Sequence, residues 1–275
     1  MSANPRRISG TRNVAVACLS MLALLVATLV YSSHLGVHED SRLQALRQIG
    51  AKIIGPRPPA RGRKRTKEDE QFSDLNPWGI IAGKLHIGKD EVRILNSFPN
   101  IRWLDLSGAD FHEVGLAFLG RFQSLEQLDL MWTTLSSNDL KSVAAIEQLG
   151  VLHLKHCKLD SSGLRHFSNF KSLYTLFLRG TEIDELGISA LSEVESLRYL
   201  DLSQCKADPR SLDLLKSLRN LHTLVLDGTR VDDKSLDSFG AMPSLKVLVI
   251  RNTSVSNNAV ERLQASNPSL RVIRE

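Results

Sequence analysis

Aromatic residues and cysteines are both scarce in this chain of 275 residues. Phe, Trp and Tyr make up only 5% of the sequence, whereas 42% is hydrophobic, so a folded core has to be built mainly from aliphatic side chains. The three cysteines, Cys18, Cys157 and Cys205, include no Cys-x-x-Cys pair, which excludes a disulfide-rich scaffold.

Familiar catalytic and nucleotide-binding motifs are absent as well. The sequence contains no Gly-x-Ser-x-Gly, His-Glu-x-x-His or Gly-x-Gly-x-x-Gly motif. The segment GIIAGK lacks the spacing and the Ser or Thr of a phosphate-binding loop. We therefore predict that the protein is not an enzyme and that it uses no cofactor.

The positive charge of the chain is concentrated in its N-terminal part. The formal net charge is +5, and residues 1–76 hold 12 of the 35 Lys and Arg residues but only 6 of the 30 Asp and Glu residues. The longer remainder is close to neutral, which argues against a basic groove along a folded body. We expect no nucleic-acid partner.

One long apolar run lies near the N-terminus. Residues 14–31 carry no charge over 18 positions, close to the roughly 20 that cross a bilayer as a helix. This run is longer than the apolar part of most cleaved signals, roughly 7–15 residues. We favour a retained transmembrane anchor over residues 14–33, with a cleaved signal and a buried helix as alternatives.

Charge near the apolar run bears on its orientation. Three arginines lie in residues 1–13, which places the N-terminus in the cytoplasm and the folded body outside. A basic run at residues 57–67 on the other side makes the margin thin and leaves a cytoplasmic body as an alternative.

Two segments connect the apolar run to the rest of the chain. Leu43, Leu46 and Ile49 recur at helical spacing, so residues 34–54 are predicted to form a helix next to the membrane. Prolines and basic residues follow, so residues 55–76 are predicted to be a flexible linker. Such a basic run can bind anionic lipid or nucleic acid, but as a solvated linker it needs no ligand.

From residue 101 onward, apolar residues recur every 24 positions. Three columns with the spacing L-x-x-L-x-L persist through seven units, beginning at Ile101, Leu104 and Leu106. Two further apolar columns begin at Phe111 and Leu116. The resulting domain, 77–275, consists of a degenerate first unit (77–100), the repeats (101–269) and a final partial strand (270–275).

Each unit combines two periodicities. The L-x-L alternation predicts a short strand with its leucines on one side, and the later apolar spacing predicts a short helix with one apolar face. Carboxylates stand just before the predicted helices, where they would cap the free backbone N–H groups: Asp160, Asp184, Asp208 and Asp232.

A column of Thr or Cys residues follows the strands. Cys157 and Cys205 lie two units apart in this column, a separation of roughly 10 Å at the usual strand spacing. That distance is too long for a disulfide bond, so we predict two buried free thiols.

The unit L-x-x-L-x-L-x-x-(T/C)-x-(L/I/V) resembles the leucine-rich repeat family. The continuations RGTEID and DGTRVD are most similar to its 24-residue bacterial type, with Thr or Cys where the family usually has Asn. The resemblance implies an α/β solenoid, a curved right-handed horseshoe with parallel strands on the concave side and short helices on the convex side. It also implies protein binding, without naming the ligand.

Binding residues are expected on the concave face, where the side chains between the leucines point. Trp, Tyr, Met and Arg often anchor protein interfaces, and residues of this kind gather in the first five repeats. The candidates are Trp103, Asp105, Gln127, Asp129, Met131, His153, Lys155, Thr175, Phe177, Arg179, Tyr199 and Asp201. We expect a protein ligand, with a cell-envelope glycan, a self-associating scaffold or a cytoplasmic-facing adaptor as alternatives.

Two small clusters invite a chemical interpretation. His153, His156 and Cys157 stand close in sequence, but the predicted register points His153 to the concave face and Cys157 toward the core, so no metal site is expected. Asp105 and Asp129 share one concave column without a candidate nucleophile, so we expect no hydrolase there.

Overall fold

The computed structural model describes residues 41–54 and 79–274. The predicted basic N-terminus (1–13), the apolar run (14–33) and the linker (55–76) lie outside these residues. Among the helices that are described, none combines the length and the apolar character needed to cross a bilayer.

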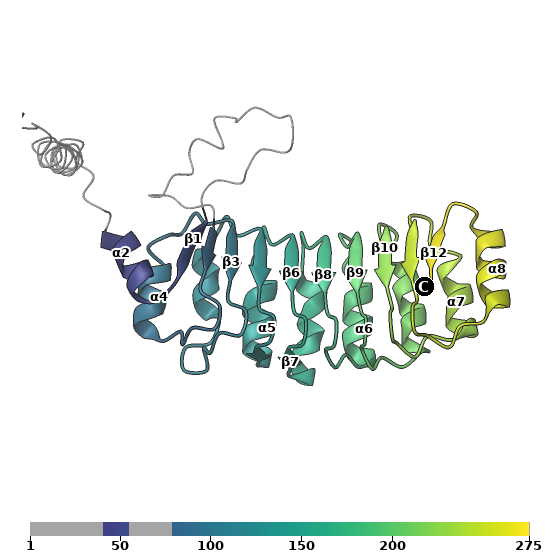
Figure 1. Cartoon of the computed structure of the whole chain (residues 1–275), viewed down its shortest axis with the longest axis horizontal. Helices are drawn as coiled ribbons and strands as arrows, with labels where there is room; N and C mark the ends of the chain where they lie inside the picture. Colours follow the sequence, from purple (N-terminus) through teal and green to yellow (C-terminus); the bar gives the residue numbers. More distant parts are fainter. Residues whose placement is uncertain (1–40, 55–78, 275) are drawn as a thin grey trace, which may run out of the picture. The chain divides into compact units, whose positions relative to one another are not determined.

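The repeat domain and the preceding segment Lys52–Ile54 form one ten-stranded sheet (Figure 1) in the order β1-β2-β3-β4-β6-β8-β9-β10-β11-β12. All neighbouring strands are parallel except β1, which is antiparallel to β2. The strands are β1 (Lys52–Ile54), β2 (Gly79–Ile81), β3 (Trp103–Asp105), β4 (Gln127–Asp129), β6 (Val151–His153), β8 (Thr175–Phe177), β9 (Tyr199–Asp201), β10 (Thr223–Val225), β11 (Val247–Val249) and β12 (Arg271–Ile273). A small second sheet pairs β5 (Thr134–Leu135) with β7 (Lys158–Leu159).

Short helical segments follow the strands and form a second row beside the sheet (Figure 1). Three of them are 3₁₀ helices, labelled η, and each packs against the segment of the next repeat. In chain order, the helical segments of this row are α4 (Lys89–Leu95), η1 (Ala117–Arg121), α5 (Ser137–Ala144), η2 (Ser161–Asn169), α6 (Glu185–Ser192), η3 (Ser211–Ser217), α7 (Asp233–Phe239) and α8 (Asn257–Ser266).

The leucine columns form the core between the sheet and the helical row. Leu152, Leu176 and Leu200 lie opposite one another on β6, β8 and β9, and each is 0% exposed. Burying a leucine side chain is worth about 1.5–3 kcal/mol relative to leaving it in water. Because one repeat cannot bury its own leucines, the stacking of repeats supplies most of the stability.

Three of the four predicted caps are confirmed. Asp160, Asp184 and Asp232 precede η2, α6 and α7, and their carboxylates accept backbone N–H groups of the first turn. Asp208 differs, because its carboxylate accepts the N–H of Arg210 at 2.8 Å and η3 begins only after Arg210. Asp208 therefore caps the turn that leads into η3 rather than η3 itself.

The Thr and Cys column is buried and structural. The hydroxyls of Thr133 and Thr229 donate to carbonyls three residues earlier, at 2.6 and 2.7 Å. The Cys157 thiol instead donates to the Leu130 carbonyl of the preceding repeat at 2.9 Å. Cys157 and Cys205 are buried and free, as predicted, and burial raises the pKa of the Cys205 thiol to about 11.

The segment predicted as one helix over residues 34–54 is different where it is described. Helix α2 (Ser41–Gln48) ends before Gly50, which adopts a left-handed conformation with φ of 83°. Lys52–Ile54 then forms β1 and pairs with β2, with Ile53 opposite Ile80. Gly50 stops the helix, and the β-branched isoleucines that follow favour a strand.

Candidate functional site

The open face is the side of the sheet that carries the side chains alternating with the buried leucines. The structure places all twelve predicted binding residues on β3, β4, β6, β8 and β9 or within two residues after them. Most are half-buried, while Arg179 is exposed and Asp201 is 6% exposed. The strands hold these side chains at regular spacing, because one strand follows another in register.

Three rings on adjacent strands form what we call the aromatic row: His153, Phe177 and Tyr199. The His153 ring stacks on Phe177 with 4.4 Å between centroids, and Phe177 lies 5.0 Å from Tyr199. The ammonium of Lys155 lies 4.6 Å from the centre of the Phe177 ring. These contacts fix the orientation of the rings before any ligand arrives, which lowers the entropy lost on binding.

Trp103 lies apart from the aromatic row. A Cβ built on Gly79 would be 3.0 Å from a ring carbon of Trp103, so the indole covers the neighbouring strand β2. Strand β4, with Gln127, separates Trp103 from β6. The aromatic candidates of the open face therefore fall into two groups, because Gly79 leaves room for the indole on the side away from the row.

The carboxylates of the open face end their strands. Asp105, Asp129 and Asp201 each accept the backbone N–H two residues later, at 2.8–2.9 Å. The hydroxyl of the buried Ser203 also donates to Asp201. These carboxylates therefore stabilise the turns that follow their strands, which is a structural role.

Asp129 has the most perturbed environment among them. Burial raises its pKa to about 6, and the adjacent Asp105 adds to this effect. Asp129 lies opposite His153 across β4 and β6, and burial together with Lys155 lowers the pKa of that imidazole. The open face thus changes its charge in mildly acidic solution.

The three residues of the HLKHC segment lie in different surroundings. His153 belongs to the aromatic row, His156 stacks on Trp132 with 4.1 Å between centroids, and the Cys157 thiol is buried against Leu130. Their ligand atoms do not converge on a common point.

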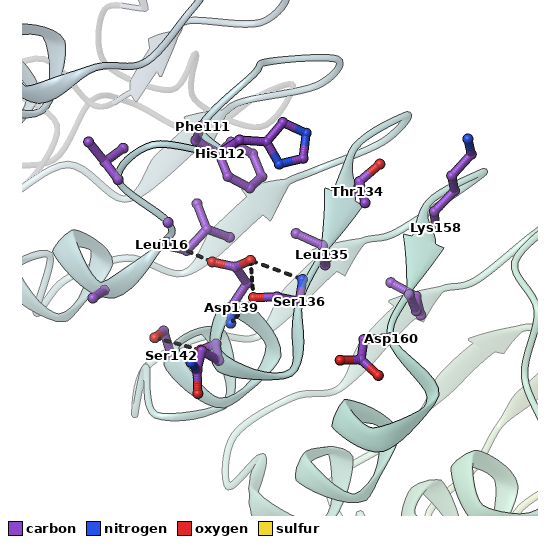
Figure 2. A pocket seen from close by; sticks show the side chains of 15 residues that line it. Phe111, His112, Leu116, Thr134, Leu135, Ser136, Asp139, Ser142, Lys158 and Asp160 are labelled. Atoms are coloured by element: carbon purple, nitrogen blue, oxygen red, sulfur yellow. Dashed lines mark hydrogen bonds between the residues drawn. The ribbon is translucent and has the colours of Figure 1, made fainter.

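Sequence reasoning missed a hollow on the helical side of the first repeats (Figure 2). Its volume is about 630 Å³, its floor includes Phe111, Leu116 and Leu135, and His112 and Lys158 stand at its rim. The buried Asp139 carboxylate accepts the N–H of Leu116 at 2.8 Å and the Ser136 hydroxyl at 2.6 Å, so its oxygens serve the fold.

The hollow exists because the first repeat lacks a helix start. His112 stands where later repeats have Asp160, Asp184 and Asp232, and the chain makes turns until η1 begins at Ala117. The missing capping residue was the available signal, since His is a poorer N-cap than Asp.

Comparisons with known proteins give the fold. No protein-family profile and no curated protein matches this sequence. A leucine-rich-repeat protein of Leptospira interrogans is similar in structure, with 18% identity, a TM-score of 0.50, and coverage of 68% of this chain and 51% of that chain. An internalin of Listeria monocytogenes has 15% identity, a TM-score of 0.49, and coverage of 70% and 58% respectively. The matched region spans little more than half of each of these two neighbours. The likeness to the Leptospira protein, the parallel sheet and the 24-residue period together show a leucine-rich-repeat fold.

Proposed function

We propose that this protein is a membrane-anchored, non-enzymatic binding module that holds a protein partner on its open face. The leucine-rich-repeat fold is in general a protein-interaction module. The observation that carries the proposal is the aromatic row with Lys155, because aromatic and cationic side chains in fixed orientations are the usual anchors of protein interfaces.

The rest of the open face supports the same role. Met131 follows the neighbouring strand β4, Arg179 follows β8 of the row itself, and Trp103 adds a second aromatic group on β3. The leucines below are fully buried and need no partner, so changes on this face leave the spine unaltered.

Anchoring rests on the sequence. The apolar residues 14–31 have the length of a bilayer span, and arginines precede them. We propose an anchor at 14–33 with residues 1–13 in the cytoplasm and the repeats outside. Protease added to intact cells should then digest the repeat domain, whereas a protected domain would favour the cytoplasmic adaptor.

Partner binding is tested with a matched pair of double variants. Phe177→Ala with Tyr199→Ala removes two rings of the row, and Val225→Ala with Val247→Ala changes the corresponding positions two repeats later. Each full-length variant is crosslinked in the cells that make it, and the captured proteins are quantified against the unaltered chain.

Proteins lost from the first variant and retained by the second would be partners of the open face. Equal capture by both variants, with unaltered thermal unfolding, would contradict the proposal.

A further inference from the structure

One column of the repeat has a left-handed backbone in every unit. The residue three positions after the end of each strand has φ between 55° and 69°: Lys84, Gly108, Trp132, His156, Gly180, Gln204, Gly228 and Asn252. Glycine and asparagine adopt this conformation readily, whereas bulky side chains adopt it at a cost. Trp132 and His156 are the two aromatic residues in this column, and they are adjacent.

These two rings form an exposed stack. The indole of Trp132 lies nearly parallel to the imidazole of His156, with 4.1 Å between centroids and 21° between planes. Trp132 is 66% exposed, the highest value among the large hydrophobic residues that the structure describes. The repeat accounts for the left-handed backbone, but it does not require an exposed indole at this position, where three other repeats have glycine.

A glycine on one side, Gly180, makes room for the stack. A Cβ on Gly180 would be 2.3 Å from Nδ1 of His156, so the imidazole lies over that glycine. On the other side, a Cβ on Gly108 would meet Lys84 at 3.5 Å and no atom of Trp132 within 4 Å. The indole therefore lies against His156 and makes no contact with Gly108.

Thr134, two residues after Trp132 in the chain, is one of the residues that line the hollow of Figure 2. Its rim carries hydroxyl, amide, ammonium and carboxylate groups from Thr134, Asn138, Lys158 and Asp160, all of them exposed. Its volume of about 630 Å³ lies in the range of small-ligand sites, about 300–1,000 Å³.

We propose that Trp132 and this hollow form a binding site for a sugar chain, separate from the open face. One pyranose ring stacks its C–H face on the indole, because the π face of an aromatic ring is negative and the sugar C–H groups are positive. The next sugar enters the hollow, where its hydroxyls meet the mixed donors and acceptors of the rim. A single flat ring beside a polar hollow suits a carbohydrate better than a peptide, which needs several apolar anchors.

The test uses the full-length protein in detergent and three soluble probes: tetrasaccharides of β-1,4-linked glucose, of β-1,4-linked N-acetylglucosamine and of α-1,4-linked galacturonic acid. Binding is measured by calorimetry and by saturation transfer from protein to sugar in NMR. Trp132→Gly removes the platform and places at that position the residue that three other repeats already have. Gln204→Gly makes the same backbone change two repeats from His156 and serves as the control.

We expect at least one tetrasaccharide to bind, and Trp132→Gly to weaken it by about tenfold or more. Gln204→Gly should bind as the unaltered chain does, and the thermal unfolding midpoint of Trp132→Gly should be unchanged or higher because glycine relieves the strain. Lys158→Ala should weaken binding to a smaller extent.

Three results would overturn the proposal. They are no binding of any probe at millimolar concentration, equal binding by Trp132→Gly, or selection of peptides from a random library whose binding depends on Trp132 while no sugar binds. Unchanged binding by Lys158→Ala would overturn the part that places a second sugar in the hollow.

Discussion

The open face differs between the first five repeats and the last strands, although the leucines beneath are the same. Strands β6, β8 and β9 carry the rings of His153, Phe177 and Tyr199. Strands β10 to β12 carry Val225, Val247, Val249 and Ile273 at corresponding positions. Leu224 and Leu248 beneath β10 and β11 are 0% exposed, as are the leucines beneath β6, β8 and β9. In this solenoid, the core residues determine stability, and the face residues are free to vary from one repeat to the next.

The sharpest test of a shared core compares one leucine from each region. Leu176→Ala and Leu224→Ala each leave a cavity under a strand, and each should lower the free energy of unfolding by about 2–5 kcal/mol. Both side chains are 0% exposed, so we expect similar losses in urea unfolding. A loss in one variant of less than half the other would show that the two regions do not share one kind of core.

A second comparison uses two left-handed glycines. Gly180→Ala and Gly228→Ala both place a Cβ at positive φ, which costs about 1 kcal/mol. Gly180→Ala must also displace His156, which lies 2.3 Å from the new Cβ, whereas the nearest atom at Gly228 is 3.5 Å away. We expect Gly180→Ala to lose about 2 kcal/mol and Gly228→Ala about half of that in thermal unfolding. Equal losses would mean that the Trp132–His156 stack moves aside without cost.

The helix caps offer a smaller effect that should be equal in both regions. Asp184→Ala and Asp232→Ala remove carboxylates that accept first-turn N–H groups at 2.9 Å, and each should cost about 1 kcal/mol. Asp208→Ala should cost less, since that carboxylate bonds Arg210 before η3 begins. Chemical denaturation of the three variants measures this order, and the largest loss at Asp208 would contradict it.

The smallest effect concerns Asp129, in the aromatic region. Its pKa rises from 3.8 to about 6 on folding, mainly through burial. The folded protein therefore binds more protons than the unfolded chain between about pH 4 and 6, so the contribution of Asp129 to stability falls as the pH rises through that window.

Asp129→Asn removes this titration. Its stability relative to the unaltered chain should increase from about pH 4 to 6, by about 1 kcal/mol at most because solvent screens a half-buried group. Urea unfolding at several pH values measures the difference. A difference that decreases over this range would mean that the sign of the pKa shift is wrong.

The sequence was informative wherever one repeat could be compared with the next. The columns of Leu104, Leu128 and Leu152 predicted the strand register, and Asp184 and Asp232 predicted helix starts. Both patterns are local and recur along the repeats, and the structure has these leucines in register and these aspartates at helix starts, as expected.

Features made by departures from the repeat were harder to foresee. Lys52–Ile54 pairs with β2 across residues 55–78, and this segment lies outside the 24-residue repeat, so the repeat pattern could not predict the pairing. The backbone of Trp132 is left-handed only because its column is, and the signal was Gly108, Gly180 and Gly228 in the same column. Likewise, the only sequence signal for the hollow was His112, which occupies the position of a helix-capping carboxylate in later repeats. The contacts of the open face stay a prediction for binding, since side-chain placement alone names no ligand.

The two thiols in the core have a practical consequence. Cys157 and Cys205 are buried, so a thiol reagent reaches them only when their own repeats separate. Burial also raises the pKa of both thiols, which keeps them in the less reactive protonated form. Mass spectrometry of the labelled peptides would therefore time the opening of the third and fifth repeats independently, in the natural chain and without any introduced probe. The two buried cysteines thus report the order in which these two repeats unfold.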